Sequence, residues 1–351
     1  MRSIRLLITC VGGRATPSLI KSLKSSAVID YTLIGVDSVS TGKSKDSLEC
    51  YYRVPSGDNT GYIDRLLEIA LKEKIDFILP GSDEEAIAIS RNKGKFSSLG
   101  IIPIVSNAEV LELISDKLKT YKALEACNLR VPEYKITNSV DEIIEFLNQY
   151  QYPKKTVVLK PASGRGGRGL YVFEGEDCPP FWLGSGSRET RVAREQFTNR
   201  LLSEAACKDG LIMPALTTPV YDVDIMAIRG EVNAVVVRER INPSGIPFQG
   251  NKIKANDLIM EYCVKVANIL KLDGLHDIDL MTNSKGEPCI IEVNPRPSGS
   301  LAASLVAGIP MVDIAILSLL NEKVPEVPSK LHTKVLMDID DMMYIASYEG
   351  N

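Results

Sequence analysis

The stretch DLMTNSKGEPCIIEVNPR, residues 279–296, says most about this chain. It predicts two short strands around a polar turn centred between Lys285 and Gly286. One interpretation is a solvated hairpin with ordinary surface acids. Apolar residues at Cys289–Ile291 and Val293 weaken that interpretation, because they indicate a strand inside a core. A carboxylate in such a strand must have a partner.

The pleat of the predicted strands sets the direction of four polar side chains. Glu292 and Asn294 are two residues apart, so on a strand they face the same side. Asp279 falls opposite Glu292, and cross-strand partners share a face with Cβ atoms roughly 5 Å apart. Three converging oxygen ligands, without histidine or cysteine, suit Mg²⁺, which usually also needs substrate phosphates. Asp279, Glu292 and Asn294 are therefore candidate metal ligands, with Arg296 beside them.

Composition indicates an ordinary globular protein of two or three domains: 351 residues, 44% hydrophobic and 25% charged. A net charge of −4 without a Lys/Arg block gives no sign of nucleic-acid binding, and no run of 18 apolar residues predicts a membrane span. The seven scattered cysteines fit buried, reduced thiols in a cytoplasmic protein. His276 and His332 cannot make a histidine-rich metal site, and residues 1–10 predict a core strand rather than a signal peptide.

The first hundred residues alternate strand and helix signals, which predicts a parallel sheet covered by helices. The strand ends carry Gly12–Arg14, Asp37 and Gly81–Glu84. Ligands of open α/β sheets bind at such carboxyl ends, but loop geometry alone also explains these residues, and both interpretations stay open. The expected strands are residues 4–10, 31–37, 76–80 and 101–105, and the expected helices cover 17–23, 62–74 and 84–93.

Later residues mix helices and strands less regularly. The composition between residues 178 and 198 predicts a surface excursion, and residues after 327 form a tail without a predicted place. Helical patterns are expected within 107–128, 140–150, 256–270 and 300–320, and strands at 156–161, 210–215, 222–228 and 233–239.

Two glycine-containing loops are candidate phosphate sites. TGKS, residues 41–44, ends like a P-loop, but Asp37 stands where the first glycine is required. GRGGRG, residues 164–169, is followed by a strand at 170–173, so no helix N-terminus awaits a pyrophosphate. Strand, loop and strand instead predict a flap whose N–H groups fold over phosphates, with Lys160 on the strand before it. A plain glycine-rich turn is the alternative.

Together these motifs resemble the ATP-grasp superfamily, and most closely the carbamoyl-phosphate synthetase large chain and stand-alone amino-acid ligases. The resemblance covers residues 1–320, with a lysine after Asp116, then VLKP at 158–161, the glycine flap, a hinge strand and the metal set in the family's order. It implies an α/β fold, α+β in the central and C-terminal parts: an ATP-grasp fold with an N-terminal parallel-sheet domain. The implied domains are residues 1–107, 108–209 with the flap, 210–330 with the metal site, and a tail at 331–351.

The resemblance also implies contacts to the nucleotide. Lys117 and Lys160 would contact ATP phosphates, with Lys160 also near the adenine pocket. Met213 and Ala215 lie on the segment that presents backbone groups to adenine, where the usual hinge acid is missing. Asp222 is a substitute for the ribose-binding acid. Four glycines would cover the β- and γ-phosphates: Gly164, Gly166, Gly167 and Gly169.

On the substrate side, Arg296 would steady the transferred phosphoryl group or the acyl intermediate. Arg238 and Arg240 resemble basic residues near the substrate carboxylate, with a surface ion pair as the alternative. Gly12–Arg14, Gly81–Glu84 and Arg238–Lys254 would shape the pocket of the acceptor.

The expected function is an ADP-forming ligase that joins a small-molecule carboxylate to an amine through an acyl phosphate. Its expected cofactors are ATP and Mg²⁺, with Mn²⁺ possible. We expect no nucleic-acid or membrane partner. We expect the protein to form a homodimer. Carbamoyl phosphate is not the expected product. The alternatives are a small-molecule kinase, which would transfer phosphate to a stable acceptor, and a non-catalytic nucleotide-binding regulatory protein.

Overall fold

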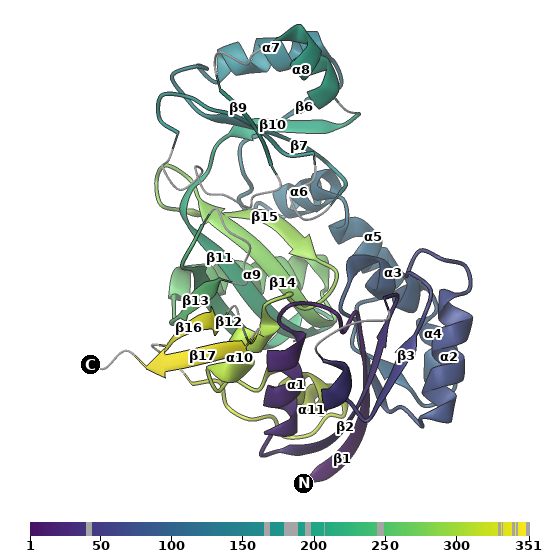
Figure 1. Cartoon of the computed structure of the whole chain (residues 1–351). Coiled ribbons are helices and arrows are strands. Elements are labelled where there is room, and N and C mark those ends of the chain that lie inside the picture. Colours follow the sequence, from purple (N-terminus) through teal and green to yellow (C-terminus); the bar gives the residue numbers. More distant parts are fainter. Residues whose placement is uncertain are drawn as a thin grey trace.

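The computed structural model describes residues 1–39, 44–164, 169–178, 189–193, 198–206, 208–243, 249–328, 331, 333–338, 341 and 343–348. Its strands form two five-stranded sheets and one seven-stranded sheet. Figure 1 shows the second five-stranded sheet at the top, above the seven-stranded sheet and the N-terminal sheet, which lie together below. Within these residues no helix combines the length and apolar character needed to cross a bilayer.

The N-terminal sheet is parallel throughout, as predicted, with strand order β3-β2-β1-β4-β5. Its strands are β1 (Arg2–Thr9), β2 (Ile29–Asp37), β3 (Cys50–Arg53), β4 (Phe77–Leu79) and β5 (Ile102–Pro103). Its helical segments are α1 (Thr16–Lys24), η1 (Lys45–Ser47), α2 (Tyr62–Lys72), α3 (Asp83–Arg91) and α4 (Lys93–Ser97).

Burial on both faces explains the apolar run in β1. Leu6 and Leu7 point to opposite faces of the sheet and both are fully buried, because helices or neighbouring elements cover each face. Strand β3 was not predicted, since it is a four-residue edge strand whose side chains are only partly buried.

The second sheet has the order β6-β10-β7-β8-β9 and is antiparallel except for the β8–β9 pair. Helices α7 and α8 cover one face of it through a separate apolar core. Part of the predicted surface excursion lies outside the described residues, but β9 falls within it. The elements are α5 (Ala108–Ile114), α6 (Lys117–Ala126), β6 (Lys135–Thr137), α7 (Val140–Gln149), β7 (Val157–Pro161), β8 (Tyr171–Phe173), β9 (Thr190–Val192), α8 (Asn199–Ala205) and β10 (Gly210–Pro214).

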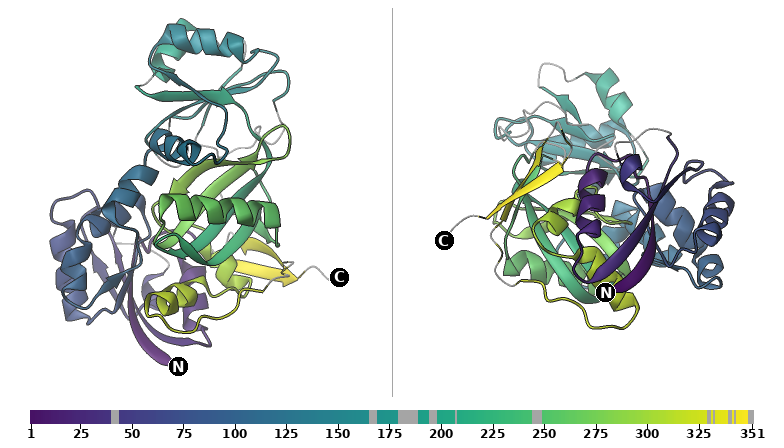
Figure 2. Two further views of the ribbon diagram at one scale, coloured as in Figure 1. Left: turned by 180° about the vertical axis from the view of Figure 1, so that it is seen from behind. Right: turned by 60° about the horizontal axis from the view of Figure 1, so that its bottom comes forward.

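The third sheet is antiparallel, with the order β15-β14-β11-β12-β13-β16-β17. Seen from behind, helix α9 lies across it (Figure 2). The elements are β11 (Thr217–Ile228), β12 (Glu231–Arg240), β13 (Gly250–Ile253), α9 (Asp257–Leu270), β14 (Gly274–Thr282), β15 (Pro288–Asn294), α10 (Leu301–Val306), α11 (Met311–Leu319), β16 (Thr333–Asp338) and β17 (Met343–Tyr348).

Helix α9 shows how local sequence sets an element of this sheet. The side chain of Asn256 caps its N-terminus by accepting a hydrogen bond from the Ile259 N–H, and Lys271 ends it in the left-handed conformation. Residues at helical spacing face the sheet and are buried: Ile259, Tyr262, Cys263, Val266, Ala267 and Leu270.

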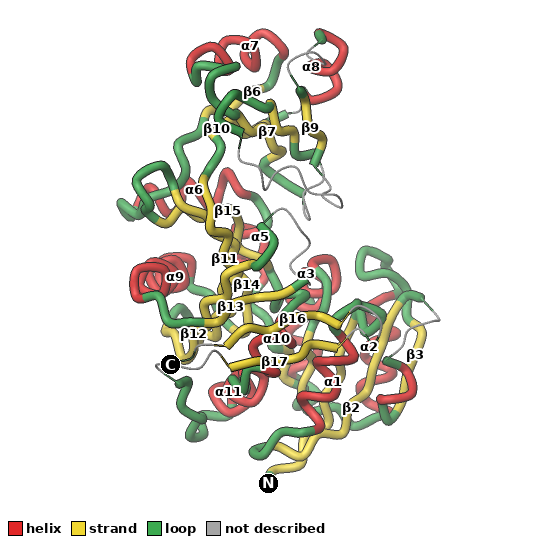
Figure 3. The backbone as a smooth tube through the Cα atoms, turned by 60° about the vertical axis from the view of Figure 1, so that its left-hand side comes forward, coloured by secondary structure: helices red, strands yellow, loops and turns green. Residues whose placement is uncertain are grey.

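Strand pairing argues for two changes to the domain boundaries proposed from the sequence. Strand β10 pairs with β6 and β7, so residues 210–214 belong with the second sheet rather than the third. The residues assigned to a tail include β16 and β17, which extend the third sheet beyond β13. Strand β17 lies beside α1 (Figure 3), where the Tyr344 N–H donates to Ser18 Oγ at 2.6 Å. Strands β16 and β17 pack against residues that are distant in the chain, so the local sequence pattern does not predict their place.

Candidate active site

The β14–β15 hairpin brings the candidate metal ligands onto one face, as predicted. Asp279 pairs with Glu292, and Asp277 pairs with Asn294. Because side chains alternate along a strand, all four point to the same side of the sheet. The predicted register at these residues is therefore confirmed, while their role as ligands remains a proposal.

The predicted turn centre is wrong by half a residue. Thr282 pairs with Pro288, which centres the turn on Lys285, and a register shift after Asp279 restores the expected pairing. The side chain of Asn283 sets the turn by accepting hydrogen bonds from the N–H groups of residues 285 and 287. Gly286 allows it, with φ of 75°. A β-bulge in the second strand therefore offsets the earlier turn.

Strand β11 adds two more acids to the same face. Asp222 pairs with Asp279 and Asp224 pairs with Asp277, and all but Asp279 are at least 95% buried. One carboxylate oxygen from each of Asp222, Asp277 and Asp279 lies within 4.8 Å of the other two. Asp224 and Asp277 were not predicted as site residues. The signal was present, since each strand carries two aspartates at a spacing of two.

Arg238 is a fully buried partner of these acids rather than a substrate contact. Its Nε donates to Asp224 at 2.8 Å and its second terminal nitrogen donates to the other oxygen at 2.9 Å. It also donates to Ser300 Oγ at 2.6 Å and has no exposed surface. Burial alone would lower the pKa of Arg238, but Asp224 and its acidic neighbours raise it. The predicted contact of Arg238 with a substrate carboxylate is therefore corrected.

Arg240 is engaged in the same network, with Asp222 and, at 3.3 Å, with Asp279. Burial would raise the pKa of Asp222, but Arg240 and Arg238 together lower it to about 2. Both oxygens of Asp222 accept hydrogen bonds from Arg240, and the residue is 1% exposed. Asp222 therefore offers no free oxygen to a ribose, which corrects its predicted role. Arg240 donates to these acids through its Nε and one terminal nitrogen, but its side chain is 16% exposed, so its contact with a substrate carboxylate stays a prediction.

Two lysines face the acids from the other side of the site. Lys117 Nζ lies 2.9 Å from Glu292 Oε2 and donates to the Gly164 carbonyl at 2.8 Å. Lys160 Nζ donates to Tyr121 Oη at 3.0 Å and lies 3.4 Å from the Ile291 carbonyl oxygen. The two predicted phosphate-binding lysines thus meet strand β15 next to the candidate metal ligands.

Burial shifts the titration of these groups. It lowers the pKa of Lys160 to about 7, helped by the positive charge of Lys117. Burial would raise the pKa of Glu292, but Lys117 and Lys160 lower it. The same burial, with Asp222 nearby, raises the pKa of Asp277 to about 7. Burial therefore opposes the charged form of acids and bases alike on this face, and neighbouring charges outweigh it at Glu292 but not at Asp277.

The donor set suits a hard divalent cation. Asp277 Oδ1 is buried without a hydrogen-bond partner, although an Arg238 nitrogen lies 3.7 Å away. Asn294 Nδ2 donates to Asp277 Oδ2 at 3.1 Å, which leaves the amide oxygen of Asn294 for another partner. Carboxylate and amide oxygens are the ligands that Mg²⁺ takes in proteins.

The loops that would contact the nucleotide are described only in part. Gly166 and Gly167 lie outside the described residues, while Gly164 and Gly169 bracket the flap with φ of 125° and 72°. Such backbone conformations favour glycine. Met213 is buried in β10 and pairs with Val158, and the Ala215 N–H donates to the Thr156 carbonyl at 3.0 Å. Ala215 therefore has only its carbonyl left to offer adenine.

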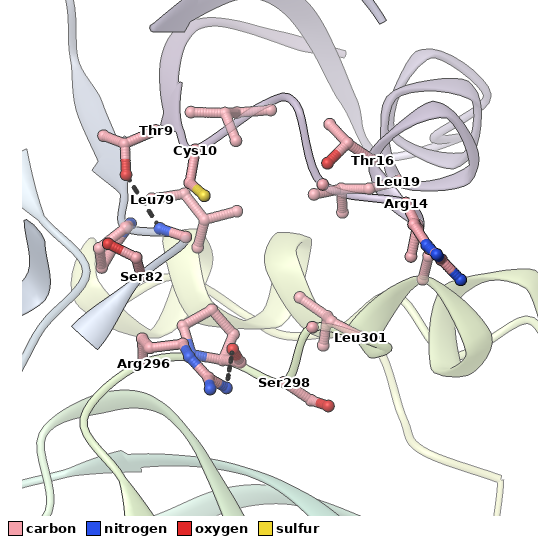
Figure 4. Close-up of a pocket in the computed structure, with 18 of the residues that line it drawn as sticks. Thr9, Cys10, Arg14, Thr16, Leu19, Leu79, Ser82, Arg296, Ser298 and Leu301 are labelled. Atoms are coloured by element: carbon pink, nitrogen blue, oxygen red, sulfur yellow. Dashed lines mark hydrogen bonds between the residues drawn. The ribbon is translucent and has the colours of Figure 1, made fainter. Parts of the chain in front are cut away.

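Arg296 connects this face with a pocket beside the N-terminal sheet. Its Nε lies 2.9 Å from Asp83 Oδ1, and a terminal nitrogen lies 3.8 Å from Asp277 Oδ2. The pocket, of about 310 Å³, is lined by the predicted loops after β1 and β4 and by residues 296–302 (Figure 4). Among the described residues of 238–254 none lines it, and their part in shaping an acceptor pocket stays a prediction.

Two protein-family profiles match separate parts of this chain. A profile described as "ATP-grasp in the biosynthetic pathway with Ter operon" matches residues 206–341, which hold the acidic face. A profile described as "PylC-like, N-terminal domain" matches residues 6–104. Residues 206–341 thus match an ATP-grasp domain, and residues 6–104 match a PylC-like N-terminal domain. The predicted resemblance is thereby confirmed.

Named relatives of this chain include carbamoyl phosphate synthases. The carbamoyl-phosphate synthase of Methanobrevibacter smithii is 26% identical over 293 residues, 78% of this chain and 71% of that protein. The carbamoyl phosphate synthase large chain of Methanothermobacter thermautotrophicus is 26% identical over 263 residues. That match covers 71% of this chain but 23% of the large chain, so this chain spans about a quarter of that relative.

Solved structures share the fold at low sequence identity. An ADP complex of N5-carboxyaminoimidazole ribonucleotide synthetase superposes with a TM-score of 0.65 at 16% identity, covering 95% of this chain and 80% of the other. An L-amino acid ligase from Bacillus licheniformis gives 0.66 at 14% identity, covering 95% and 79%. The biotin carboxylase domain dimer of Hydrogenobacter thermophilus 2-oxoglutarate carboxylase, with MgADP, gives 0.64 at 17% identity, covering 95% and 74%.

Proposed function

We propose that this ATP-grasp ligase joins a small-molecule carboxylate to an amine through an acyl phosphate, releasing ADP and phosphate. The observation that supports this best is the meeting of acids on the third sheet with Lys117 at the start of helix α6. Asp279 and Glu292 share a face of that sheet, and Lys117 reaches Glu292 at 2.9 Å. The lysine, together with a cation held by the acids, can neutralise the repulsion between a triphosphate and an incoming carboxylate.

ATP would bind between the second sheet and strands β14 and β15. Lys117 and Lys160 would contact its phosphates, and the flap at 164–169 would cover them. Lys117 is poised for this because it already holds the Gly164 carbonyl at the base of the flap. The triphosphate would favour the charged form of Lys160, whose pKa burial lowers to about 7.

Mg²⁺ is the proposed cofactor, held by Asp279, Glu292 and Asn294; Mn²⁺ would suit the same oxygens. When bound, the ion would supply Lewis-acid neutralisation of phosphate charge. The unpartnered oxygen of Asp277 and the hard-oxygen donor set support the fit. Glu292 would exchange part of its ion pair with Lys117 for the metal.

The chain's own residues would then position the reactants. Arg296, held by Asp83 at 2.9 Å, would steady the carboxylate whose oxygen attacks the γ-phosphorus as ADP leaves. The amine would attack the acyl carbon, and phosphate would leave with the electron pair of the broken C–O bond. Closure of the flap would keep water from the acyl phosphate, which is the general purpose of such lids.

A screen of carboxylates crossed with amines, read out by phosphate release, tests this function. The expected result is release that needs one carboxylate and one amine together. Hydroxylamine added in place of the amine should trap the acyl phosphate as a hydroxamate. Phosphate transfer to a stable acceptor without hydroxamate would favour a kinase, and release without any substrate pair would favour an ATPase or sensor.

Assembly is a separate part of the proposal. A homodimer is proposed by analogy with the biotin carboxylase domain dimer among the similar structures. Light scattering behind size-exclusion chromatography would measure the mass in solution. A single species at the monomer mass over a hundredfold range of protein concentration would contradict the dimer without affecting the proposed reaction.

A further inference from the structure

His276 is a fully buried residue that takes no part in the mechanism proposed above. It lies on β14 directly before Asp277, so its side chain points away from the acidic face. Its Nδ1 lies 2.9 Å from the carbonyl oxygen of Asn294. Because a carbonyl oxygen can only accept, Nδ1 carries the hydrogen and donates it. The ring thus holds the backbone of a candidate metal ligand from the side opposite the acids.

The carbonyl of Asn294 marks the point where the chain leaves the third sheet. Pairing of β14 with β15 ends at Asp277 and Asn294. The next residue, Pro295, has no N–H and cannot continue the ladder, and Arg296 follows it. The contact from His276 therefore supplies a hydrogen bond where the ladder stops. A shift of the backbone here would move the Asn294 amide and the Arg296 guanidinium together.

The other ring nitrogen connects His276 with the end of the first domain. Nε2 lies 2.8 Å from the hydroxyl oxygen of Ser106, in the segment that joins β5 to α5. The same oxygen accepts a hydrogen bond from the Asp273 N–H at 2.7 Å, and Ser106 is fully buried. His276 therefore bridges two segments that are far apart in the chain.

The segment around Ser106 is packed tightly against the start of β14. Lys93 Nζ donates to the Val105 carbonyl at 2.8 Å and lies 3.3 Å from Asp273 Oδ2. Gly274 has φ of 93°, and a Cβ there would lie 3.0 Å from the Val105 nitrogen, so both conformation and space favour glycine. The first domain is thereby held in one position relative to His276.

We propose that His276 is a positioning residue of this ligase: its Nδ1–H fixes the end of β15, which presents the Asn294 amide and the Arg296 guanidinium to the site. This rests on the proposed function and adds a residue that touches neither substrate nor metal. Arg296 is then held at both ends, since Asp83 of the first domain lies 2.9 Å from its Nε. Groups that orient a metal ligand typically change metal affinity or activity about 10- to 100-fold when they are replaced.

Two replacements separate the two ring nitrogens. His276→Asn places an amide nitrogen near the position of Nδ1 and can still donate to the Asn294 carbonyl. His276→Gln reaches the position of Nε2 and keeps only the contact with Ser106. Asparagine is the smaller side chain, so it leaves the larger cavity and should lower the thermal midpoint at least as much as glutamine. A merely structural role therefore predicts that His276→Asn is the more damaging change.

Isothermal titration of ATP into the full chain, repeated over a range of Mg²⁺ concentrations, measures the positioning without turnover. In His276→Gln the Mg²⁺ concentration that gives half-maximal ATP affinity should rise about tenfold, and in His276→Asn it should stay within about twofold of the unmodified chain. Hydroxamate formation should follow the same order, with kcat reduced about tenfold or more in His276→Gln.

Ser90→Ala is the matched control. Ser90 Oγ donates to the Ser106 carbonyl at 2.6 Å and is buried, so this change loosens the same segment without touching the imidazole. It should lower the thermal midpoint and leave the Mg²⁺ dependence unchanged.

The unmodified chain offers a second measurement, which holds even if neither His276 variant folds. The sequence has two histidines, His276 and His332, so a ¹⁵N spectrum of the imidazoles has few signals, and His332→Gln assigns them. We expect a hydrogen on Nδ1 of His276 and a shift of that signal when Mg²⁺ and ATP are added together. A hydrogen on Nε2 alone, or a signal that does not respond, would overturn the positioning role.

The variants can refute it as well. Unchanged Mg²⁺ dependence in His276→Gln would do so, as would a loss in His276→Asn that equals or exceeds the loss in His276→Gln. The proposed function fails separately: if His276→Gln weakens Mg²⁺-dependent ATP binding but no carboxylate yields a hydroxamate, the positioning role stands and the ligase assignment falls. ATP binding that ignores Mg²⁺ in the unmodified chain would overturn the metal site and this role with it.

Discussion

Replacing Arg238 by methionine separates a structural role from a catalytic one. The substitution keeps an unbranched side chain of similar length and removes the charge. In the folded protein Arg238 has no exposed surface, and it is the bidentate partner of Asp224. Its loss leaves at least one carboxylate buried without its cation. We therefore expect the third sheet to be strongly destabilised.

The magnitude follows from the burial of the pair. Removing one partner of a buried ion pair costs about 3–5 kcal/mol, because the remaining charge cannot return to water. By contrast, Arg65→Met removes an exposed pair with Glu68, and such pairs contribute about 0–1 kcal/mol. Adding Asp224→Asn to Arg238→Met should recover part of the lost stability, because the effects of two substitutions in one network on the free energy of unfolding are not additive.

Hydrogen exchange measured peptide by peptide can detect this loss of stability in individual strands. A loss of about 3–5 kcal/mol corresponds to exchange roughly 150- to 4,000-fold faster for protected amides of β11 and β12. Arg65→Met should leave those amides unchanged. If Arg238→Met kept its exchange protection and lost phosphate release, Arg238 would be a substrate contact and the buried-pair reasoning would be refuted.

Three further predictions concern the proposed site. Glu292→Gln should lower phosphate release at least a hundredfold with the thermal midpoint nearly unchanged; preserved turnover would contradict the metal assignment. ATP should raise the thermal midpoint only with Mg²⁺ present, and Asn294→Ala should weaken this shift; equal stabilisation in EDTA would contradict it. Because burial and Lys117 lower the pKa of Lys160 to about 7, Lys160 is mostly neutral at pH 8, where ATP should bind with proton uptake and lose affinity as pH rises. Titration in two buffers of different ionisation enthalpy measures that uptake, and Lys160→Arg should abolish it, so persistent uptake would point to another group.

The hairpin shows how far periodicity alone can predict a site. Alternation put Asp279, Glu292 and Asn294 on one face, and the structure confirms that register. It could not reveal the bulge after Asp279, because alternation assumes an unbroken register, or the earlier turn, which the side chain of Asn283 sets. The error in the turn and the bulge offset each other, so the face was right although the turn was not.

The partners of the arginines could not be predicted in this way. Arg238 and Arg240 stand in the sequence as a basic pair, equally suited to a substrate and to an ion pair. Pairing of β12 with β11 brings them onto Asp222 and Asp224, which lie about 14 to 18 residues earlier in the chain. The acids on β14 then compete for the same cations.

By itself, the sequence determined the alternation of the first domain, the spacing of the hairpin acids and the order of the ATP-grasp motifs, since each depends on residues close together in the chain. Tertiary structure alone decided that β16 and β17 complete the third sheet, which acid each arginine pairs with, and that Arg14, Asp83 and Arg296 line one pocket. Those outcomes depend on burial and charge neutralisation between segments that are far apart in the chain and meet only when the sheets pack.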